Sequence, residues 1–213
     1  GVSTYLHPIS DDALLSIGVG GDEAGADWWN TTVSLFNVSD FSNPVRTDLQ
    51  SLALDPSWYG YSEAQWDHKA FQYFAPKKLL SVPLEGAKYS EGPDNDNDGY
   101  ADYYTYEYIS ELVLLNVDEQ AGLSIKGTID HSPYYATSPC YWSPGVRRTI
   151  FMGDYIYGIS GRVITVSRTS DLQLMTSQEL APQPEYDESG YCYGGGGMGG
   201  DDGGGGGDEP LPL

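Results

Sequence analysis

Apolar residues in the segment 1–181 gather in runs of four to eight, separated by Gly, Pro, Asp and Asn. The runs are rich in Val, Ile, Leu and Tyr, which favour β-strands because they pack well on a pleated surface. No stretch keeps the helical period of about 3.6 residues for long. The pattern predicts an all-β fold of short strands and regular turns, as in a sandwich, a barrel or a propeller.

A repeat in these apolar runs distinguishes among the three folds. The run LLSI at 14–17 matches LLSV at 79–82, and LFNV at 35–38 matches LLNV at 114–117 in the same order. A third, more compact copy follows, with runs at 148–152, 155–159, 162–166 and 172–175. Each copy contains about four strands, the size of one β-propeller blade.

Three such units are too few for a closed propeller, which usually has about four to eight blades. We predict three four-stranded antiparallel blades at approximately residues 3–54, 66–132 and 146–181, within a propeller body of residues 1–181. Either the missing blades precede this segment in a longer parent chain, or another subunit completes the ring. The absence of an amino-terminal methionine favours a carboxy-terminal fragment.

The composition changes abruptly after Ala181. Residues 182–213 are rich in glycine, carry acidic residues and contain no lysine or arginine. Such a segment buries too little apolar surface to offset the entropy of an ordered backbone. We therefore predict a disordered, Gly/Asp-rich carboxy-terminal tail that acts as a spacer.

The sequence DNDNDGYAD at 94–102 has the spacing of a calcium-binding loop. Carboxylates stand at loop positions 1, 3, 5 and 9, the residue at position 7 offers its backbone carbonyl, and a glycine at position 6 permits a sharp bend. Hard oxygen ligands at this spacing suit Ca²⁺. The predicted metal ligands are Asp94, Asp96, Asp98, Tyr100 and Asp102.

The residues around this loop argue against an EF-hand. Position 12 of the loop is Thr105, where an EF-hand has a bidentate glutamate, and residues 103–109 are aromatic or β-branched rather than helical. The flanks therefore predict a β-hairpin, and the motif resembles the calcium loops between propeller strands of integrin-type repeats. The alternative interpretation is a solvated acidic turn without a metal.

Charge limits the kinds of partner. Ten basic residues against 31 acidic ones give a net charge of −21, which would repel the phosphate backbone of a nucleic acid. No apolar run approaches the roughly 18 residues that would span a bilayer. The acidic balance, the scarcity of lysine and a calcium loop suited to millimolar calcium favour a secreted or cell-surface protein.

Two cysteines, Cys140 and Cys192, are present in the whole chain. An even number in an oxidising compartment favours a disulfide, which here would join the start of the tail to the body. Two free thiols are the alternative.

Five motifs in order carry a resemblance to a known family: residues 3–8, 14–18, 33–40 with the Asn-Pro at 43–44, 67–71 and 147–151. Together they resemble the carboxy-terminal half of secreted β-propeller proteins of bacteria and archaea, distantly related to WD40 repeats. The resemblance covers the whole body and implies an extracytoplasmic or surface-attached propeller. It brings no catalytic residues, and members of that family are considerably longer than this chain.

Histidines and arginines give weaker signals. His7, His68 and His131 fall at predicted strand ends, where a histidine can bond between strands. The alternative is that residues 67–69 line the central channel, with His68 as a general acid or base. Arg147-Arg148 either pairs with acidic side chains or binds a carboxylate or phosphate group in the channel.

These features favour a calcium-stabilised surface scaffold for binding or adhesion, with a protein or glycan as the partner. The alternative is a propeller enzyme, an oxidoreductase or hydrolase, with its active site in the channel. Fold analogy alone is weak support for chemistry, and the sequence shows no cysteine-histidine metal cluster, nucleophile elbow or cofactor motif. Loop aromatics either bind that partner or cap the core: Trp28-Trp29, Trp58-Tyr59, Tyr61, Trp66, Tyr134-Tyr135 and Tyr141-Trp142.

Overall fold

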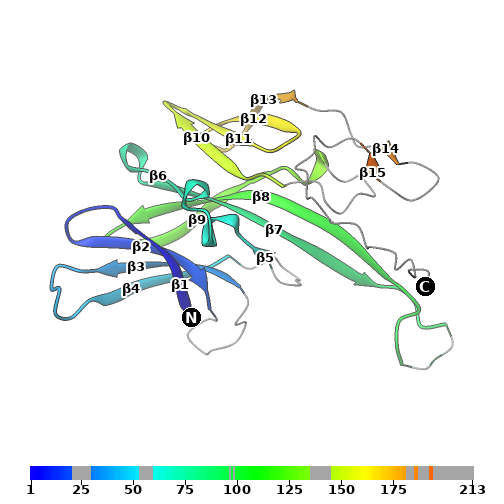
Figure 1. The fold of residues 1–213 in the computed structure, drawn as a ribbon, viewed down its shortest axis with the longest axis horizontal. Helices are drawn as coiled ribbons and strands as arrows, with labels where there is room; N and C mark the ends of the chain where they lie inside the picture. Colours follow the sequence, from blue (N-terminus) through cyan, green and yellow to red (C-terminus); the bar gives the residue numbers. More distant parts are fainter. Residues whose placement is uncertain are drawn as a thin grey trace, which may run out of the picture.

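Three antiparallel β-sheets follow one another along the chain (Figure 1). The structure is a computed structural model, and it describes residues 1–20, 30–52, 60–95, 97, 99–134, 145–180, 185–186 and 192–193. The helical segments in these ranges are four short 3-10 turns. None of the described helical segments is long and apolar enough to cross a lipid bilayer.

The first sheet has four strands in the order β1-β2-β3-β4. They are β1 (Val2–Pro8), β2 (Ala13–Val19), β3 (Thr31–Asn37) and β4 (Val45–Ser51). Alternate residues of the two central strands are fully buried, and Leu15 pairs with Leu35 while Ile17 pairs with Val33. One face of this sheet is therefore a continuous apolar surface.

The second sheet is the largest and has the order β5-β7-β8-β9, with β6 paired to β7. Two of its strands are unusually long, β7 (Leu79–Glu91) and β8 (Tyr104–Asp118). The others are β5 (Gly60–Tyr61), β6 (Gln72–Phe74) and β9 (Gly122–Asp130). The 3-10 turns are η1 (Glu63–Gln65), η2 (His68–Ala70), η3 (Ala75–Lys77) and η4 (Ser132–Tyr134).

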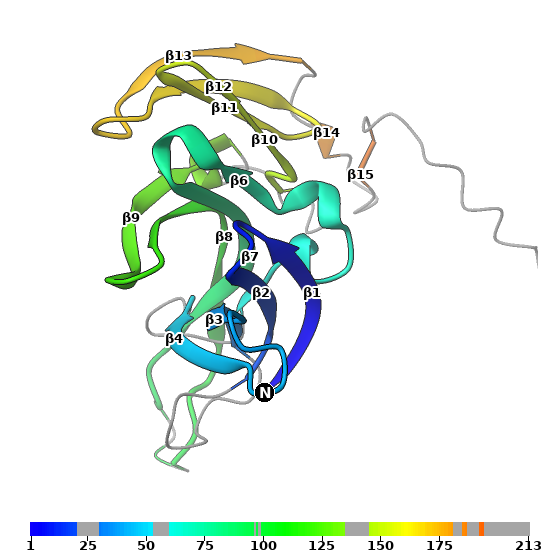
Figure 2. The same ribbon diagram turned by 90° about the vertical axis from the view of Figure 1, so that its left-hand side faces the viewer.

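The third sheet is again four-stranded, in the order β10-β11-β12-β13. Its strands are β10 (Arg148–Met152), β11 (Tyr155–Ile159), β12 (Val163–Arg168) and β13 (Leu174–Glu179). Figure 2 shows the three sheets one above another as an open fan, in chain order. The first and second sheets meet where β1 and β2 lie against η1 and where β3 and β4 lie against β9. The second and third sheets meet where β10 lies against β6, β7 and η2.

Two hydrophobic cores hold the fan together. The core between the first and second sheets contains Leu15, Ile17, Val33, Leu35, Leu80, Val82, Val113 and Leu115. The core between the second and third sheets contains Leu112, Leu114, Ile129, Val146 and Ile156. Each fully buried leucine or isoleucine contributes roughly 1.5–3 kcal/mol.

Strand β8 explains how the middle sheet serves both cores. Its residues 112–115 point alternately to the two faces, so Leu112 and Leu114 enter one core while Val113 and Leu115 enter the other. A strand covered on both faces has no polar side, which is why this stretch reads as an unbroken apolar run.

The predicted fold class is confirmed: the described chain is all-β, with three antiparallel sheets that do not close into a ring. The repeated motifs occupy corresponding strands. Residues 14–17 lie in β2 and their match 79–82 lies in β7. Residues 35–38 begin in β3 and their match 114–117 lies in β8. The middle sheet departs from four strands, because the short β5 and β6 both pair along β7, and β5 begins at Gly60, ahead of the expected 66.

The tail also differs from expectation at four residues. Within the segment predicted to be wholly disordered, β14 (Glu185–Tyr186) and β15 (Cys192–Tyr193) form a two-stranded antiparallel ladder. Both strands include a tyrosine, a residue with high strand propensity that the glycine-rich average of the segment concealed. The rest of the tail lies outside the described residues.

Candidate functional site

The loop predicted to bind calcium lies at the tip of a projecting two-stranded ribbon. Strand β7 pairs with β5 no further than Gly86, and β8 pairs with β9 no further than Glu111. From Ala87 and Tyr108 outward, β7 and β8 pair only with each other. We call residues 87–108 the arm; it extends from the second sheet away from the body (Figure 1).

Backbone hydrogen bonds close the tip of the arm. Gly92 N donates to Tyr103 O at 2.8 Å, and Asp102 N donates to Pro93 O at 2.9 Å. The loop that these bonds enclose begins with Asp94 and ends with Asp102, the first and last predicted carboxylate ligands. Both carboxylates are exposed at the neck of the loop.

Inside the tip, the chain curls back as the motif requires. Asn97 and Gly99 have positive φ values of 57° and 92°, and a Cβ on Gly99 would meet no atom within 4 Å. Glycine is therefore required at this position by its backbone angle rather than by crowding. The turn brings Gly99 N to Asp94 Oδ2 at 3.0 Å, so loop positions 1 and 6 are in contact.

The described part of the tip fits a calcium site incompletely. Asp102 Oδ2 accepts hydrogen bonds from the backbone and side-chain nitrogens of Asn95, so a metal would use its other oxygen or displace them. Asp96 and Asp98 lie outside the described residues. Among those described, no three His, Cys, Asp or Glu side chains are grouped closely enough to hold a metal ion.

Two tyrosines expose their side chains beside these carboxylates. Tyr100 is 73% exposed and Tyr103 is 55% exposed. The ring of Tyr103 lies over Gly92, where an added Cβ would come within 2.9 Å of its carbons. The tip of the arm thus combines exposed carboxylates with exposed aromatic faces, a combination suited to contact with a partner.

An ion-pair cluster joins the turns η1 and η2 of the second sheet to the start of β10 in the third sheet. Arg147 binds Glu63 of η1 through Nε at 2.5 Å and Nη2 at 2.8 Å, and Arg148 binds Glu63 at 3.0 Å and Asp67 at 2.5 Å. Burial of Glu63 acts to raise its pKa, but the hydrogen bonds from both arginines outweigh it and lower the pKa. Of the two alternatives for the arginines, the structure therefore shows pairing with acidic side chains.

Glu85 of β7 has a partly buried carboxyl group next to this cluster. Its Oε2 accepts hydrogen bonds from Tyr61 Oη at 2.8 Å and Tyr108 Oη at 2.9 Å. Burial raises the pKa of Glu85 despite these two hydrogen bonds. The backbone of Gly145 lies against the carboxyl, where a Cβ would come within 2.1 Å of Oε1. This group was not among the residues predicted from the sequence, although an acidic residue directly after the largely apolar run 79–84 was the available signal.

The three histidines have different environments. His131, directly after β9, is fully buried, and its Nε2 lies 2.9 Å from Thr165 Oγ1 in the third sheet. Burial lowers the pKa of His131 to about 4. His7 in β1 packs against Phe71, with ring centroids 5.4 Å apart. His131 thus forms a side-chain hydrogen bond as expected, but the bond joins two sheets rather than two strands of one sheet.

His68 does not lie at a strand end as expected; it is the first residue of η2. Its neighbour Asp67 caps this turn by accepting a hydrogen bond from Lys69 N at 2.9 Å, and it also binds Arg148. Of residues 67–69, which were the alternative acid–base group of the channel, Asp67 and the backbone of Lys69 therefore stabilise the turn η2.

Several predicted features fall outside the described residues. Cys140 is one, so its pairing with Cys192 stays a prediction. The aromatic residues at 28–29, 58–59, 135 and 141–142 are also outside. Of the described loop aromatics, Trp66 is 69% exposed and Tyr61 is 40% exposed.

Comparison with known proteins agrees with the observed architecture. A stretch of 78 residues is 40% identical to part of an uncharacterized protein of Methanocaldococcus jannaschii. This stretch covers 36% of this chain and 12% of that relative. The match thus spans a small part of the relative's length. A family model described as "Beta propeller domain" matches residues 1–172, the stretch that contains all three sheets up to the end of β12. The chain therefore belongs to the β-propeller domain family.

Proposed function

We propose that this chain is part of an extracytoplasmic β-propeller that serves as a surface binding or adhesion scaffold, and that the arm contacts its protein or glycan partner. The observation that carries the proposal is the shape of the arm. Its five strand pairs, from Ala87–Tyr108 to Glu91–Tyr104, extend about 17 Å beyond the sheet at roughly 3.3 Å per residue. A structural blade has no need of so long an extension, whereas a binding element does.

Calcium at the tip is the second part of the proposal. A two-stranded ribbon is marginally stable by itself in water. Residues 87–108 contain six acidic residues and one lysine, so charge repulsion adds to this weakness. A Ca²⁺ ion held by Asp94, Asp96, Asp98, Asp102 and the Tyr100 carbonyl would offset half of the charge of these four carboxylates and reduce their mutual repulsion. The positive φ of Gly99 and its bond to Asp94 support this geometry.

Calcium titration tests the metal. Extracellular modules bind calcium with Kd of about 10⁻⁴–10⁻³ M, so millimolar calcium should stabilise the fold by about 1 kcal/mol, measured as a rise in Tm over the chelated protein. Asp94→Asn, Asp96→Ala and Asp98→Ala should each abolish the rise, and magnesium should substitute poorly. The control is Asp11→Asn, which makes the same charge change as Asp94→Asn in the β1–β2 turn. A chelator-insensitive Tm together with no calorimetric heat of binding would leave only an acidic turn.

A binding screen tests the role of the arm. The chain would be applied to glycan and protein arrays in calcium and in chelator, beside a variant in which Asn-Gly replaces residues 89–106. Lys88 and Glu107 face each other in the ladder, so a two-residue turn can join them. The proposal expects ligands that bind the intact chain in calcium and not the shortened variant. Equal binding by both chains would place the contact elsewhere.

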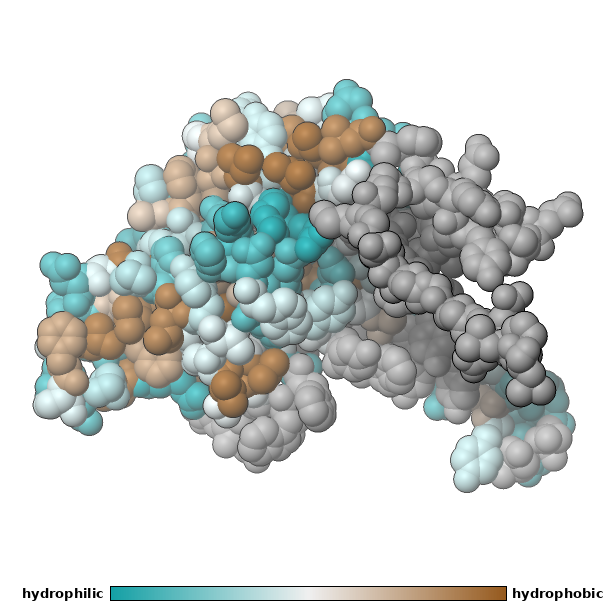
Figure 3. All heavy atoms as spheres, viewed as in Figure 1, coloured by the Kyte–Doolittle hydropathy of each residue, from teal (hydrophilic) through white to brown (hydrophobic). Residues whose placement is uncertain are grey.

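Further blades are the remaining proposed partners. The outer face of the third sheet, which points away from the second, carries the aligned row Ile150, Tyr157 and Val166 and the pair Ile159 and Ile164. In Figure 3, hydrophobic residues gather at the top, over the third sheet. The second sheet buries such a face on both sides. We propose that a further blade, from the parent chain or another subunit, covers this outer face.

The extracytoplasmic location has its own test. It is supported by the net charge of −21 and by the calcium loop, which suits a compartment rich in calcium. In such a compartment Cys140 and Cys192 should be joined, so non-reducing peptide mapping of secreted material should recover one linked peptide pair. Recovery of both as free thiols would count against the bond and the location.

An enzyme remains the second candidate function, and Glu85 is the observation that favours it. A carboxyl group whose pKa is raised by burial is suited to general acid catalysis. The tyrosines that bond to Glu85 would then hold its orientation. If the chain has a hydrolytic activity that Glu85→Gln abolishes while the Tm is unchanged, Glu85 would be assigned as its general acid.

A further inference from the structure

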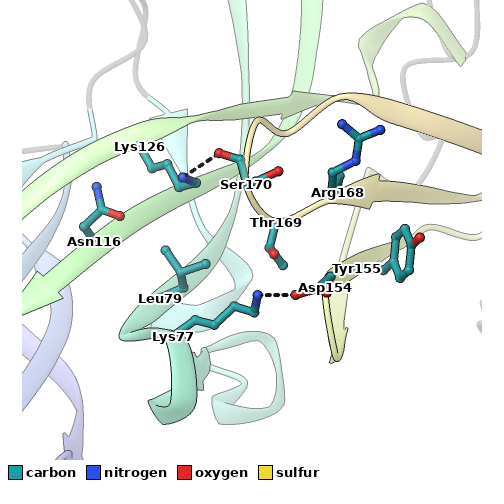
Figure 4. A pocket seen from close by; sticks show the side chains of 9 residues that line it. All are labelled: Lys77, Leu79, Asn116, Lys126, Asp154, Tyr155, Arg168, Thr169 and Ser170. Carbon is teal, nitrogen blue, oxygen red and sulfur yellow. Dashed lines mark hydrogen bonds and ion pairs between the residues drawn. The ribbon is translucent and has the colours of Figure 1, made fainter.

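A cavity of about 500 Å³ opens between the second and third sheets. It lies at the start of β7 and the end of β8, whereas the arm lies at their other ends, so the two features occupy opposite rims of the fan. Figure 4 shows the side chains that line it, which come from η3 and β7–β9 on one side and from two turns of the third sheet on the other. Its volume is in the range of small-molecule sites, roughly 300–1,000 Å³.

The cavity concentrates positive charge in a strongly acidic protein. Three of the ten basic residues line it, Lys77, Lys126 and Arg168, together with a single acidic residue, Asp154. Lys77 Nζ binds Asp154 at 2.5 Å. Arg168 binds Asp171, outside the lining, at 2.7 Å. Two of the three cations are therefore already neutralised.

Lys126 is the exception. Its Nζ donates to the Ser170 carbonyl at 3.0 Å, so it bridges the two sheets, as Figure 4 shows. In the described part of the chain it makes no ion pair. An ammonium group has three donors and keeps capacity for further acceptors. The cavity thus offers one uncompensated positive charge, which suits a ligand with one negative charge.

The remaining lining indicates the rest of the ligand. Asn116, Thr169 and Ser170 supply neutral hydrogen-bonding groups near the apolar side chain of Leu79. Such groups pair well with hydroxyls. A phosphate dianion would be better matched by an arginine fork, but Arg168 donates through Nη1 to Asp171 and through Nη2 to Met175 Sδ.

We propose that this cavity binds an acidic monosaccharide of the uronate class, with its carboxylate on Lys126 and its hydroxyls on Asn116, Thr169 and Ser170. The site is separate from the arm and does not need calcium. It gives the molecule a glycan-binding rim opposite the arm, whether or not the arm binds a partner of its own.

The test is an NMR titration of the chain in chelator with D-glucuronate or D-galacturonate, following the amide signals of Thr169 and Ser170. Uronates should cause saturable shifts, while neutral D-glucose and acetate should bind at least about tenfold more weakly, the difference expected for losing one charged or several neutral hydrogen bonds. Lys126→Gln should weaken uronate binding about tenfold. Lys69→Gln, the same charge change at an exposed site in η2, should not.

A second variant guards against an uninformative result. Asn116→Asp places a negative charge at the cavity and should also weaken uronate binding, while circular dichroism shows the same fold. Uronate binding that is unchanged in Lys126→Gln, or matched by D-glucose, would overturn the proposal. Acetate binding as tightly as glucuronate would overturn the sugar class. The shortened arm variant should keep uronate binding, so failure here and failure of the arm proposal are distinguishable.

Discussion

His131 and Gly158 illustrate how single residues position neighbouring sheets. A Cβ on Gly158 would lie 2.6 Å from His131 Nε2 and 2.8 Å from Thr165 Oγ1. The glycine therefore admits the imidazole ring to the face of β11, where it reaches Thr165. Nδ1 of His131 is buried, and none of the described residues provides it with a hydrogen-bond partner. A second proton on this ring would be buried without compensation, so the neutral form is favoured.

This environment predicts a pH dependence of stability. The pKa of His131 is about 4 in the folded chain and 6.5 as a free side chain, so below pH 6.5 the unfolded chain binds a proton that the folded chain does not. Stability is therefore complete above pH 6.5 and falls toward pH 4, by about 3 kcal/mol in all. Urea unfolding at pH 7.5 and pH 5 should differ by about 2 kcal/mol.

The matched variant for this measurement is His131→Gln, whose amide can still reach a hydroxyl but does not titrate. Its loss of stability between the two pH values should be clearly smaller than that of the parent. His7, whose pKa burial also lowers, contributes equally to both proteins. Identical pH slopes for parent and variant would contradict the assignment to His131.

At the scale of elements, the arm is a separable unit. Its described ladder joins β7 only to β8, and both strands enter the body through residues that the cores bury, such as Leu84 and Ile109. The body should therefore fold without the arm. The ion-pair cluster of η1, η2 and β10, by contrast, joins elements of two sheets and belongs to the body.

Replacing residues 89–106 by Asn-Gly should accordingly cost no stability in chelator. Shortening the connection from about 22 residues to about six lowers its closure entropy, which favours folding by up to about 1 kcal/mol. Chemical unfolding in chelator measures this effect, and the same variant should show no response to calcium. A loss of more than about 1 kcal/mol would mean that the arm packs against the body.

At the scale of the whole molecule, the fan ends in an exposed apolar face. Within β10, Ile150 is 47% exposed and Met152 is 58% exposed, whereas the opposite face of the same sheet is packed against the second sheet. An apolar patch of this kind indicates an interaction surface. With a net charge of −21, two copies of this chain repel each other, which favours a further blade as the occupant.

The exposed face predicts binding of a neutral apolar dye. The chain should enhance the fluorescence of Nile red, and the double variant Ile150→Thr/Val166→Thr should reduce the enhancement to about half, because it removes the centre of the patch. Phe41→Ser is the control, since Phe41 is 86% exposed in a turn of the first sheet, away from this face. An equal reduction by the control would show that the dye does not report on the outer face.

Local features of this protein could be predicted from its sequence, because contiguous residues encode them. The apolar runs mark β2, β7, β3 and β8, and their repetition indicates the blades. The curl of the loop at Gly99 follows from the spacing of aspartates and glycine. The two short strands β5 and β6 were not predicted, since strands of two and three residues have too few positions to show an alternation of apolar and polar residues.

Contacts between sheets, and side-chain contacts between paired strands, were decided by the tertiary structure alone. Glu63 and Arg147 are 84 residues apart, His131 and Thr165 are 34 apart, and Tyr61 meets Glu85 only because β5 pairs with β7 in one register. The cavity beside Lys126 likewise exists only where turns of the third sheet reach the second. Periodicity identifies strands and their buried faces, whereas the packing and register of whole sheets decide which polar side chains meet.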